Sequence, residues 1–169
     1  MTMKKKIAII TGSDSDMPIA EKCMNVLKKL GIIYEAHIIS AHRTPEKARD
    51  FALNARKNNF GIIIAIAGKA AHLAGVLAAY TRLPVIGVPV KSDDLGGLDA
   101  LLSTVQMPSG VPVSCVAIDG GANAAWLAAR ILAVSDDEIA EKLERESELM
   151  TENVNAKDKT LQEKLNHEQ

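Results

Sequence analysis

The chain has 169 residues, the length of one ordinary domain, and 47% of them are hydrophobic, which is enough material for a single core. Its 20 Lys and Arg residues and 21 Asp and Glu residues leave a formal net charge of -1. Bulk attraction to nucleic acid or to acidic membranes is therefore not expected. An aromatic content of 3% argues further against a stacking surface for single strands. No apolar run approaches the roughly 20 residues of a membrane-spanning helix.

The two cysteines, Cys23 and Cys115, form no CxxC motif, and neither has a pairing partner nearby in the sequence. Isolated cysteines of this kind are typical of reduced thiols in a cytosolic protein. The lysines near the start precede an apolar run, Ile7 to Ile10, that is too short for the hydrophobic part of a signal peptide. We therefore predict a cytoplasmic location.

Short apolar segments alternate with longer segments of helical period along most of the chain. The expected strands are Ile7–Thr11, Tyr34–Ile39, Gly61–Ala67, Pro84–Val88 and Val113–Ile118. The expected helices are Pro18–Leu30, Pro45–Asn58, Ala70–Tyr80, Gly97–Val105 and Asn123–Leu132. Pro18 and Pro45 stand where the first turn of a helix tolerates proline, and Gly31 follows Leu30 as a helix stop. The alternation predicts a three-layer, doubly wound α/β fold with a parallel sheet, of the flavodoxin-like or Rossmann-like kind. The strand order stays open.

The C-terminal segment is expected to add one further helix. Ser135 precedes three acidic residues, as at many helix starts, and Ile139 and Leu143 begin a thin apolar stripe that needs a partner surface. We predict that residues 1–150 form a single α/β catalytic domain that includes this helix. The almost wholly polar residues 151–169 are predicted to form a polar tail or an extension of the helix.

Ligands of open α/β sheets bind outside the carboxyl ends of the strands, so polar strand-to-helix loops are the best site candidates. The first such loop, Gly12–Asp16, reads GSDSD. Its glycine, its hydroxyls and the following helix N-terminus could hold an anion or a ribose. Ser13 and Asp16 could equally well cap the helix. The loop matches neither GxGxxG nor a Walker sequence, so both interpretations remain open.

The second loop, Ser40–Pro45, reads SAHRTP and carries the sharpest local signal. Arg43 suits bidentate binding of a phosphate, and His42 suits proton transfer near neutral pH. The alternative is a capping turn with a surface histidine and arginine.

The third loop leaves an apolar strand through small residues that would let a ligand approach the backbone of Gly68. Small residues also serve close packing of helix on sheet, so His72 is either a pocket wall or a histidine at a helix start. Residues 91–97 are expected to be a mobile cover or an ordinary surface loop.

The sequence contains no HExxH motif, paired Cys/His set or carboxylate cluster, so no metal is predicted. It also lacks the GxSxG motif of a serine hydrolase.

Five motifs together resemble those of the N5-carboxyaminoimidazole ribonucleotide mutase family. They are GSDSD at 12–16, SAHRTP at 40–45, AAHL at 70–73, PVIGVPV at 84–90 and LLSTVQMPSGVPV at 101–113. Each motif alone is modest, but five in the right order and spacing are very specific. The resemblance covers about residues 5 to 135.

The resemblance implies an isomerase of purine biosynthesis. Such an enzyme moves the carboxylate of its substrate from N5 to C4, by decarboxylation and recarboxylation, and yields 4-carboxy-5-aminoimidazole ribonucleotide. The resemblance further implies no metal or organic cofactor, a flavodoxin-like subunit and a homo-octamer. In such an octamer, the C-terminal helix would find its partner surface on a neighbouring subunit.

The same resemblance assigns roles to individual residues. It makes His42 the catalytic proton shuttle, which protonates the departing nitrogen and then removes the proton from C4. Ser13, Asp16 and Arg43 would hold the ribose and phosphate. The full set of implied substrate-binding residues is Ser13, Asp16, Ser40, Arg43, Gly68, Lys69, His72 and Leu73.

One motif departs from the family pattern. The usual AGGAAHLPG appears as AGKAAHLAG, so Lys69 stands where a glycine is common. Related carboxylases that take free carbon dioxide have a basic residue near this point, but they resemble SAHKGP and AGRSNG. Because this chain keeps Arg43 and His72, the mutase is favoured over such an aminoimidazole ribonucleotide carboxylase. A non-catalytic nucleotide- or flavin-binding module is a third alternative, although it would have no need of His42.

Overall fold

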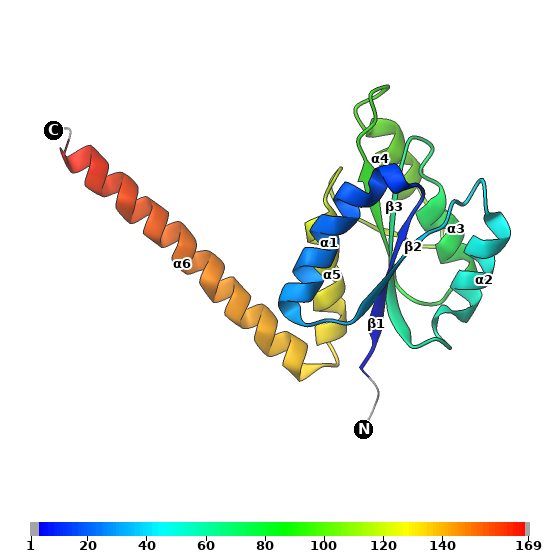
Figure 1. The fold of residues 1–169 in the computed structure, drawn as a ribbon, viewed down its shortest axis with the longest axis horizontal. Helices are drawn as coiled ribbons and strands as arrows, with labels where there is room; N and C mark the ends of the chain where they lie inside the picture. The colour runs from blue at the N-terminus through cyan, green and yellow to red at the C-terminus, as the bar shows by residue number, and fades with distance from the viewer. Residues whose placement is uncertain (1–3, 168–169) are drawn as a thin grey trace.

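The computed structural model describes residues 4–167, which form a parallel five-stranded sheet between two layers of helices (Figure 1). The strands are β1 (Lys6–Thr11), β2 (Tyr34–Ile38), β3 (Phe60–Gly68), β4 (Val85–Val90) and β5 (Ser114–Cys115). The helices are α1 (Met17–Leu30), α2 (Pro45–Ala55), α3 (Leu73–Tyr80), α4 (Leu98–Val105), α5 (Gly121–Ala133) and α6 (Asp137–His167), with a short 3-10 turn, η1 (Asp14–Asp16). This confirms the predicted three-layer, flavodoxin-like α/β fold. Within the described residues, no helix is long and apolar enough to cross a membrane.

The core has two halves, one on each face of the sheet. Successive side chains of β3 alternate between them: Ile62 and Ile64 face α1 and α5, whereas Ile63 faces α2 and α3. Both faces are therefore apolar, as in parallel sheets covered on both sides. Alanines of α2 and α5 lie fully buried against the sheet, so the helix axes come close to it.

The strand expected at Val113–Ile118 is much shorter than predicted, because only Ser114 and Cys115 pair with β4. The cause lies in the neighbouring strand. The carbonyl of Pro89 accepts a hydrogen bond from the Asp119 N–H at 2.9 Å, so the proline faces this edge of the sheet. Proline has no N–H to donate in return, and the ladder ends before it reaches this position.

Several helix boundaries also differ from those predicted, most of all in the second and third helices. The second helix ends at Ala55 instead of Asn58, because the chain turns at Asn59, whose φ is +65°. The third begins at Leu73 instead of Ala70, since Lys69 has a φ of +55° and two tight turns follow it. The last helix is capped by Asp136, whose carboxylate accepts a hydrogen bond from the Ile139 N–H at 3.2 Å.

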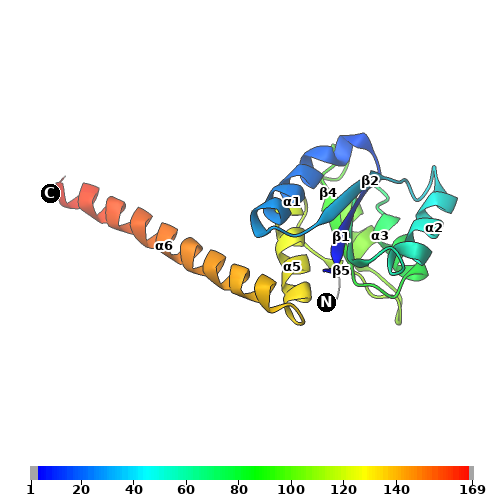
Figure 2. The same ribbon diagram turned by 60° about the horizontal axis from the view of Figure 1, so that its bottom comes forward.

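Helix α6 leaves the domain after its first turns and extends far beyond it (Figures 1 and 2). Ile139 is buried and Leu143 packs against the α1 and α5 side of the core, but every residue from 147 to 166 is exposed. The helix runs through the predicted division at residue 150 without a break as far as His167. The last two residues of the segment predicted as a tail or extension, 168–169, lie outside the described residues.

Candidate active site

The strand order β2-β1-β3-β4-β5 places β2 and β3 on opposite sides of β1. The loops that leave β1 and β3 therefore diverge, and a crevice opens at the carboxyl ends of the strands. A cavity of about 660 Å³ lies there, within the range usual for small-molecule sites. Its walls come from the loops after β1, β2, β3 and β4. The lining residues are Gly12, Ser13, Ser15, Asp16, Ser40, Ala41, His42, Arg43, Ala67, Gly68, Lys69, Ala70, Leu73, Val90, Lys91, Ser92, Asp93 and Asp94.

The structure brings the predicted site residues together. All of them line the cavity except His72, which lies directly beside it against His42. The wall made by Asp93 and Asp94 was expected only as a cover or surface loop, and neither residue was singled out from the sequence. Their position after the fourth strand was the one available signal.

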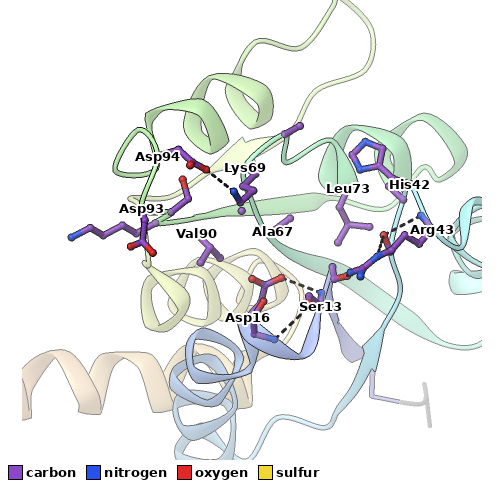
Figure 3. Close-up of a pocket in the computed structure, with 18 residues that line it drawn as sticks. Ser13, Asp16, His42, Arg43, Ala67, Lys69, Leu73, Val90, Asp93 and Asp94 are labelled. Atoms are coloured by element: carbon purple, nitrogen blue, oxygen red, sulfur yellow. Dashed lines mark hydrogen bonds and ion pairs between the residues drawn. The ribbon is translucent and has the colours of Figure 1, made fainter.

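The loop after β1 is ordered by a reciprocal cap. The Ser13 hydroxyl accepts a hydrogen bond from the Ser15 N–H, and the Asp16 carboxylate accepts one from the Ser13 N–H at 3.1 Å. The capping interpretation is therefore correct for these residues. Because the same residues line the cavity, the cap also fixes their positions relative to a ligand (Figure 3).

Asp16 is only 6% exposed. Burial raises the pKa of its carboxyl group, and the hydrogen bonds from the Ser13 and Gly12 backbone oppose that rise only partly. The group is thus a weaker acid than a surface aspartate. A carboxyl in this setting suits hydroxyl groups of a ligand better than a phosphate, which it would repel once ionised.

Arg43 joins the loops after β1 and β2. Its guanidinium donates to the Gly12 carbonyl at 3.2 Å, and its backbone N–H donates to the Ser40 hydroxyl at 3.2 Å. The Thr44 hydroxyl accepts from the Ser40 N–H and donates to the Ser40 carbonyl, both at 3.0 Å. These bonds hold an exposed guanidinium at the rim of the cavity, where it can bind an anionic group.

The histidines of the second and third loops form a pair. The Nε2 atom of His42 lies 2.9 Å from the Nδ1 atom of His72, and the two rings meet edge to face. A hydrogen bond between imidazole nitrogens needs one N–H and one lone pair, so the two facing nitrogens share one proton. His72 is the N-cap residue of α3, as the helix-start interpretation expects, and it lies beside the cavity lining and not within it. The pair can accept, hold and return a proton at the cavity.

The loops after β3 and β4 approach closely and close the remaining side of the cavity. A Cβ atom on Gly68 would lie 3.4 Å from the Val90 carbonyl oxygen, at ordinary van der Waals contact, so the two segments pack directly against each other there. Beyond this contact, the Lys69 ammonium bonds the Asp94 carboxylate at 2.5 Å (Figure 3). Within the part of the chain that the structure describes, no group of three or more His, Cys, Asp or Glu residues could hold a metal ion.

This fold and site define an α/β protein that holds a small ligand at the switch point of a parallel sheet, with an acid–base pair beside it. Comparison with known proteins is more specific. Residues 6–153 match the family described as AIR carboxylase, and the chain belongs to that family.

Individual relatives agree with this membership. The chain is 53% identical over 160 residues to the N5-carboxyaminoimidazole ribonucleotide mutase of Pyrococcus horikoshii, a match that covers 95% of this chain and 90% of that one. It is 49% identical over 158 residues to the mutase of Thermotoga maritima, covering 94% and 92%. It is 50% identical to part of the phosphoribosylaminoimidazole carboxylase of Saccharomyces cerevisiae, covering 85% of this chain but 25% of that one. The crystal structure of Treponema denticola PurE superposes with a TM-score of 0.86 at 33% identity, covering 94% and 99%.

Replacement of Arg43 tests whether the cavity rim binds an anion. We expect Arg43→Ala to weaken binding of a nucleoside or ribose monophosphate about 10- to 100-fold, the loss typical for a hydrogen bond to a charged group. Isothermal titration calorimetry measures this directly. Arg49→Ala is the matched control, because Arg49 lies on α2 beside Tyr80, outside the cavity lining. Equal affinities of the two variants would contradict the role given to Arg43.

Proposed function

We propose that this protein is an N5-carboxyaminoimidazole ribonucleotide mutase of purine biosynthesis. It moves the substrate carboxylate from N5 to C4 and releases 4-carboxy-5-aminoimidazole ribonucleotide. The observation that carries the proposal is the His42–His72 pair beside the cavity, with Arg43 on the same loop. The names of relatives about 50% identical over nearly the whole chain support the substrate and the reaction.

One imidazole, that of His42, carries the proton for both reacting atoms. The bond between N5 and the carboxylate breaks, carbon dioxide leaves, and the electron pair stays on N5, which takes a proton from His42. C4 then attacks the carbon dioxide, and its proton returns to His42, so the enzyme ends in its starting state. The reaction as written needs no metal or organic cofactor. His72 shares a proton with the Nε2 atom of His42 through the hydrogen bond between the two rings.

The phosphate and the ribose of the substrate are assigned to the loops after β1 and β2. Arg43 binds the phosphate as a bidentate donor. Ser13 and Asp16 hold the ribose, for which the weakly acidic, capped carboxyl of Asp16 is suited. Ser40 orients Arg43, while Gly68 and Leu73 bound the space left for the ring and its carboxylate.

The alternative is a carboxylase that uses free carbon dioxide, the name carried by the yeast relative. The test is conversion of N5-carboxyaminoimidazole ribonucleotide in buffer depleted of carbon dioxide, compared with conversion of aminoimidazole ribonucleotide plus bicarbonate. We expect rapid product formation from the carboxylated substrate. Turnover from aminoimidazole ribonucleotide and carbon dioxide alone would favour the carboxylase, and turnover of neither would favour a binding module.

Replacement of His42 tests its assignment as the proton carrier. His42→Asn should lower kcat by about 10²- to 10⁴-fold, the usual contribution of general acid–base catalysis, while substrate still binds. Stopped assays and calorimetry together separate the two effects. His37→Asn is the control, since His37 lies on β2 against Phe51 and outside the cavity lining. Near-normal turnover of His42→Asn would remove the proton-transfer role.

We also propose that the chain assembles as a homo-octamer. Leu95, Leu98, Leu102 and Val105 recur at helical spacing on and before α4 and are 46–64% exposed, a stripe that a monomer would leave in water. Helix α6 carries a second exposed stripe that includes Val154 and Leu161.

The unpaired thiols of Cys23 and Cys115 fit the reducing cytoplasm, where we place the enzyme.

A charge within the α4 stripe tests the assembly. We expect Leu102→Glu to lower the mass measured by light scattering from eight subunits to smaller species, because an ionised carboxylate would be buried at the contact. Gln106→Glu is the control, as it adds the same charge at an exposed position just beyond α4. An octamer unaffected by Leu102→Glu would show that this stripe is not the contact, and a monomeric wild type would refute the assembly.

A further inference from the structure

Lys69 occupies a backbone position that suits glycine better than lysine. Its φ is +55°, in the left-handed region that non-glycine residues enter only at a cost. The Lys69 side chain contributes little to packing, since 73% of it is exposed. A strained residue persists where the surroundings hold it, and such positions cluster at functional sites. The strained backbone and the exposed side chain of Lys69 therefore point to a functional role for this residue.

The Lys69 side chain reaches from the loop after β3 to the loop after β4. Its ammonium lies 2.5 Å from the Asp94 carboxylate, at the mouth of the cavity that both residues line (Figure 3). The hydrogen bond and the charge of Asp94 raise the pKa of Lys69, with smaller contributions from the charges of Asp99 and Asp93. Within residues 4–167, this is the one ion pair that joins the two loops.

The loop after β4 is attached at both ends and carries Asp94 near its middle. At one end, the Lys91 N–H donates to the Asp119 carboxylate at 2.9 Å. At the other, Gly96 and Gly97 have φ values of +62° and +94°, a conformation that glycine adopts freely. A Cβ on Gly97 would lie 2.9 Å from the Ile118 side chain, so this end is packed against the domain, whereas no atom would contact a Cβ on Gly96 within 4 Å. Asp94 thus lies between the two held ends of the loop, and Lys69 ties it to the loop after β3.

We infer that Lys69 and Asp94 form a latch that keeps the loop 91–97 over the cavity, so that carbon dioxide released from the substrate is recaptured instead of lost. The inference rests on the proposed function, in which carbon dioxide is a free intermediate. Retention depends on the cover, because a small neutral molecule has no charge by which the site could hold it. Lys69 is therefore a positioning residue that acts through Asp94.

The expected size of the effect follows from the exposure of the pair. The side chains of Lys69 and Asp94 are 73% and 62% exposed. Exposed ion pairs shift an equilibrium by about two- to fivefold, and salt screens them. Breaking the latch should consequently raise the escape of carbon dioxide by a similar factor, without abolishing turnover.

The test measures where the carboxylate carbon of the product comes from. Substrate labelled with ¹³C in its carboxylate is converted in buffer that contains unlabelled bicarbonate, and mass spectrometry gives the labelled fraction of the product. We expect Asp94→Asn to raise loss of label about two- to fivefold over wild type, after subtraction of the loss without enzyme. Asp50→Asn, the same isosteric change at an exposed position on α2 outside the cavity lining, is the control and should retain label like the wild type. Higher salt should raise the loss in the wild type and leave Asp94→Asn unchanged.

A direct contact between Lys69 and the substrate carboxylate predicts a different outcome. In that case Lys69→Gly, which also relieves the left-handed backbone, would raise KM, whereas Asp94→Asn would free the ammonium and leave label retention unchanged. Such a result would overturn the latch. The exchanged pair Lys69→Asp/Asp94→Lys should restore retention if the latch is correct, and aspartate tolerates the φ of this position better than most residues.

Hydrogen exchange separates failure of the latch from failure of the proposed function. The backbone amides of residues 92–97 should exchange faster in Asp94→Asn than in Asp50→Asn, whatever reaction the protein catalyses. Equal exchange in the two variants would overturn the latch even if the mutase assay succeeds. Faster exchange without turnover of the mutase substrate would overturn the link to carbon dioxide while the contact itself stands.

Discussion

The site depends on the pairing of β1 with β3 at the centre of the sheet. The two strands run parallel in register from Ile7 opposite Ile62 to Thr11 opposite Ile66, and the Gly12 N–H continues the ladder by donating to the Ile66 carbonyl at 3.0 Å. Because β1 connects next to β2 on its other side, the chains that leave these paired ends must separate. The same buried ladder thus supports the fold and creates the cavity.

The polar groups around this cavity are held mainly by short local bonds. Ser13 and Asp16 cap each other, and Ser40 holds Arg43, so each loop fixes its own functional side chains. The contacts between loops are fewer. They include the Arg43 bond to Gly12, the histidine pair and the ion pair of Lys69. Loops that are rigid within themselves and lightly tied to one another keep a precise arrangement while the cavity remains open to solvent.

The sequence predicted what depends on local pattern and left out what depends on distant pairing. The five strands and their helices follow from hydrophobic period and from proline and glycine at helix ends. The shortened β5 does not, because its cause is Pro89 on another strand. Likewise, the sequence singled out His42 and His72 separately, but no spacing rule states that residues 30 apart will share a hydrogen bond. Ser13 shows a third case: the sequence allows either capping or cavity lining, and in the structure one residue does both.

The cavity must open for the nucleotide and stay closed over a released small molecule. These two requirements explain why the contact at its mouth, between Lys69 and Asp94, is exposed and weak. A nucleotide must enter and leave in every cycle, which favours an open loop, whereas a released small molecule must stay until the ring carbon captures it. A buried hydrophobic lid would satisfy the second demand and slow the first, because product release is often limited by such an opening. An ion pair in solvent shifts the balance toward closure by a small factor and breaks easily. The strained backbone of Lys69 costs about 1–2 kcal/mol, more than an exposed ion pair returns in stability, so the contact is better explained by a role in function than by a role in folding.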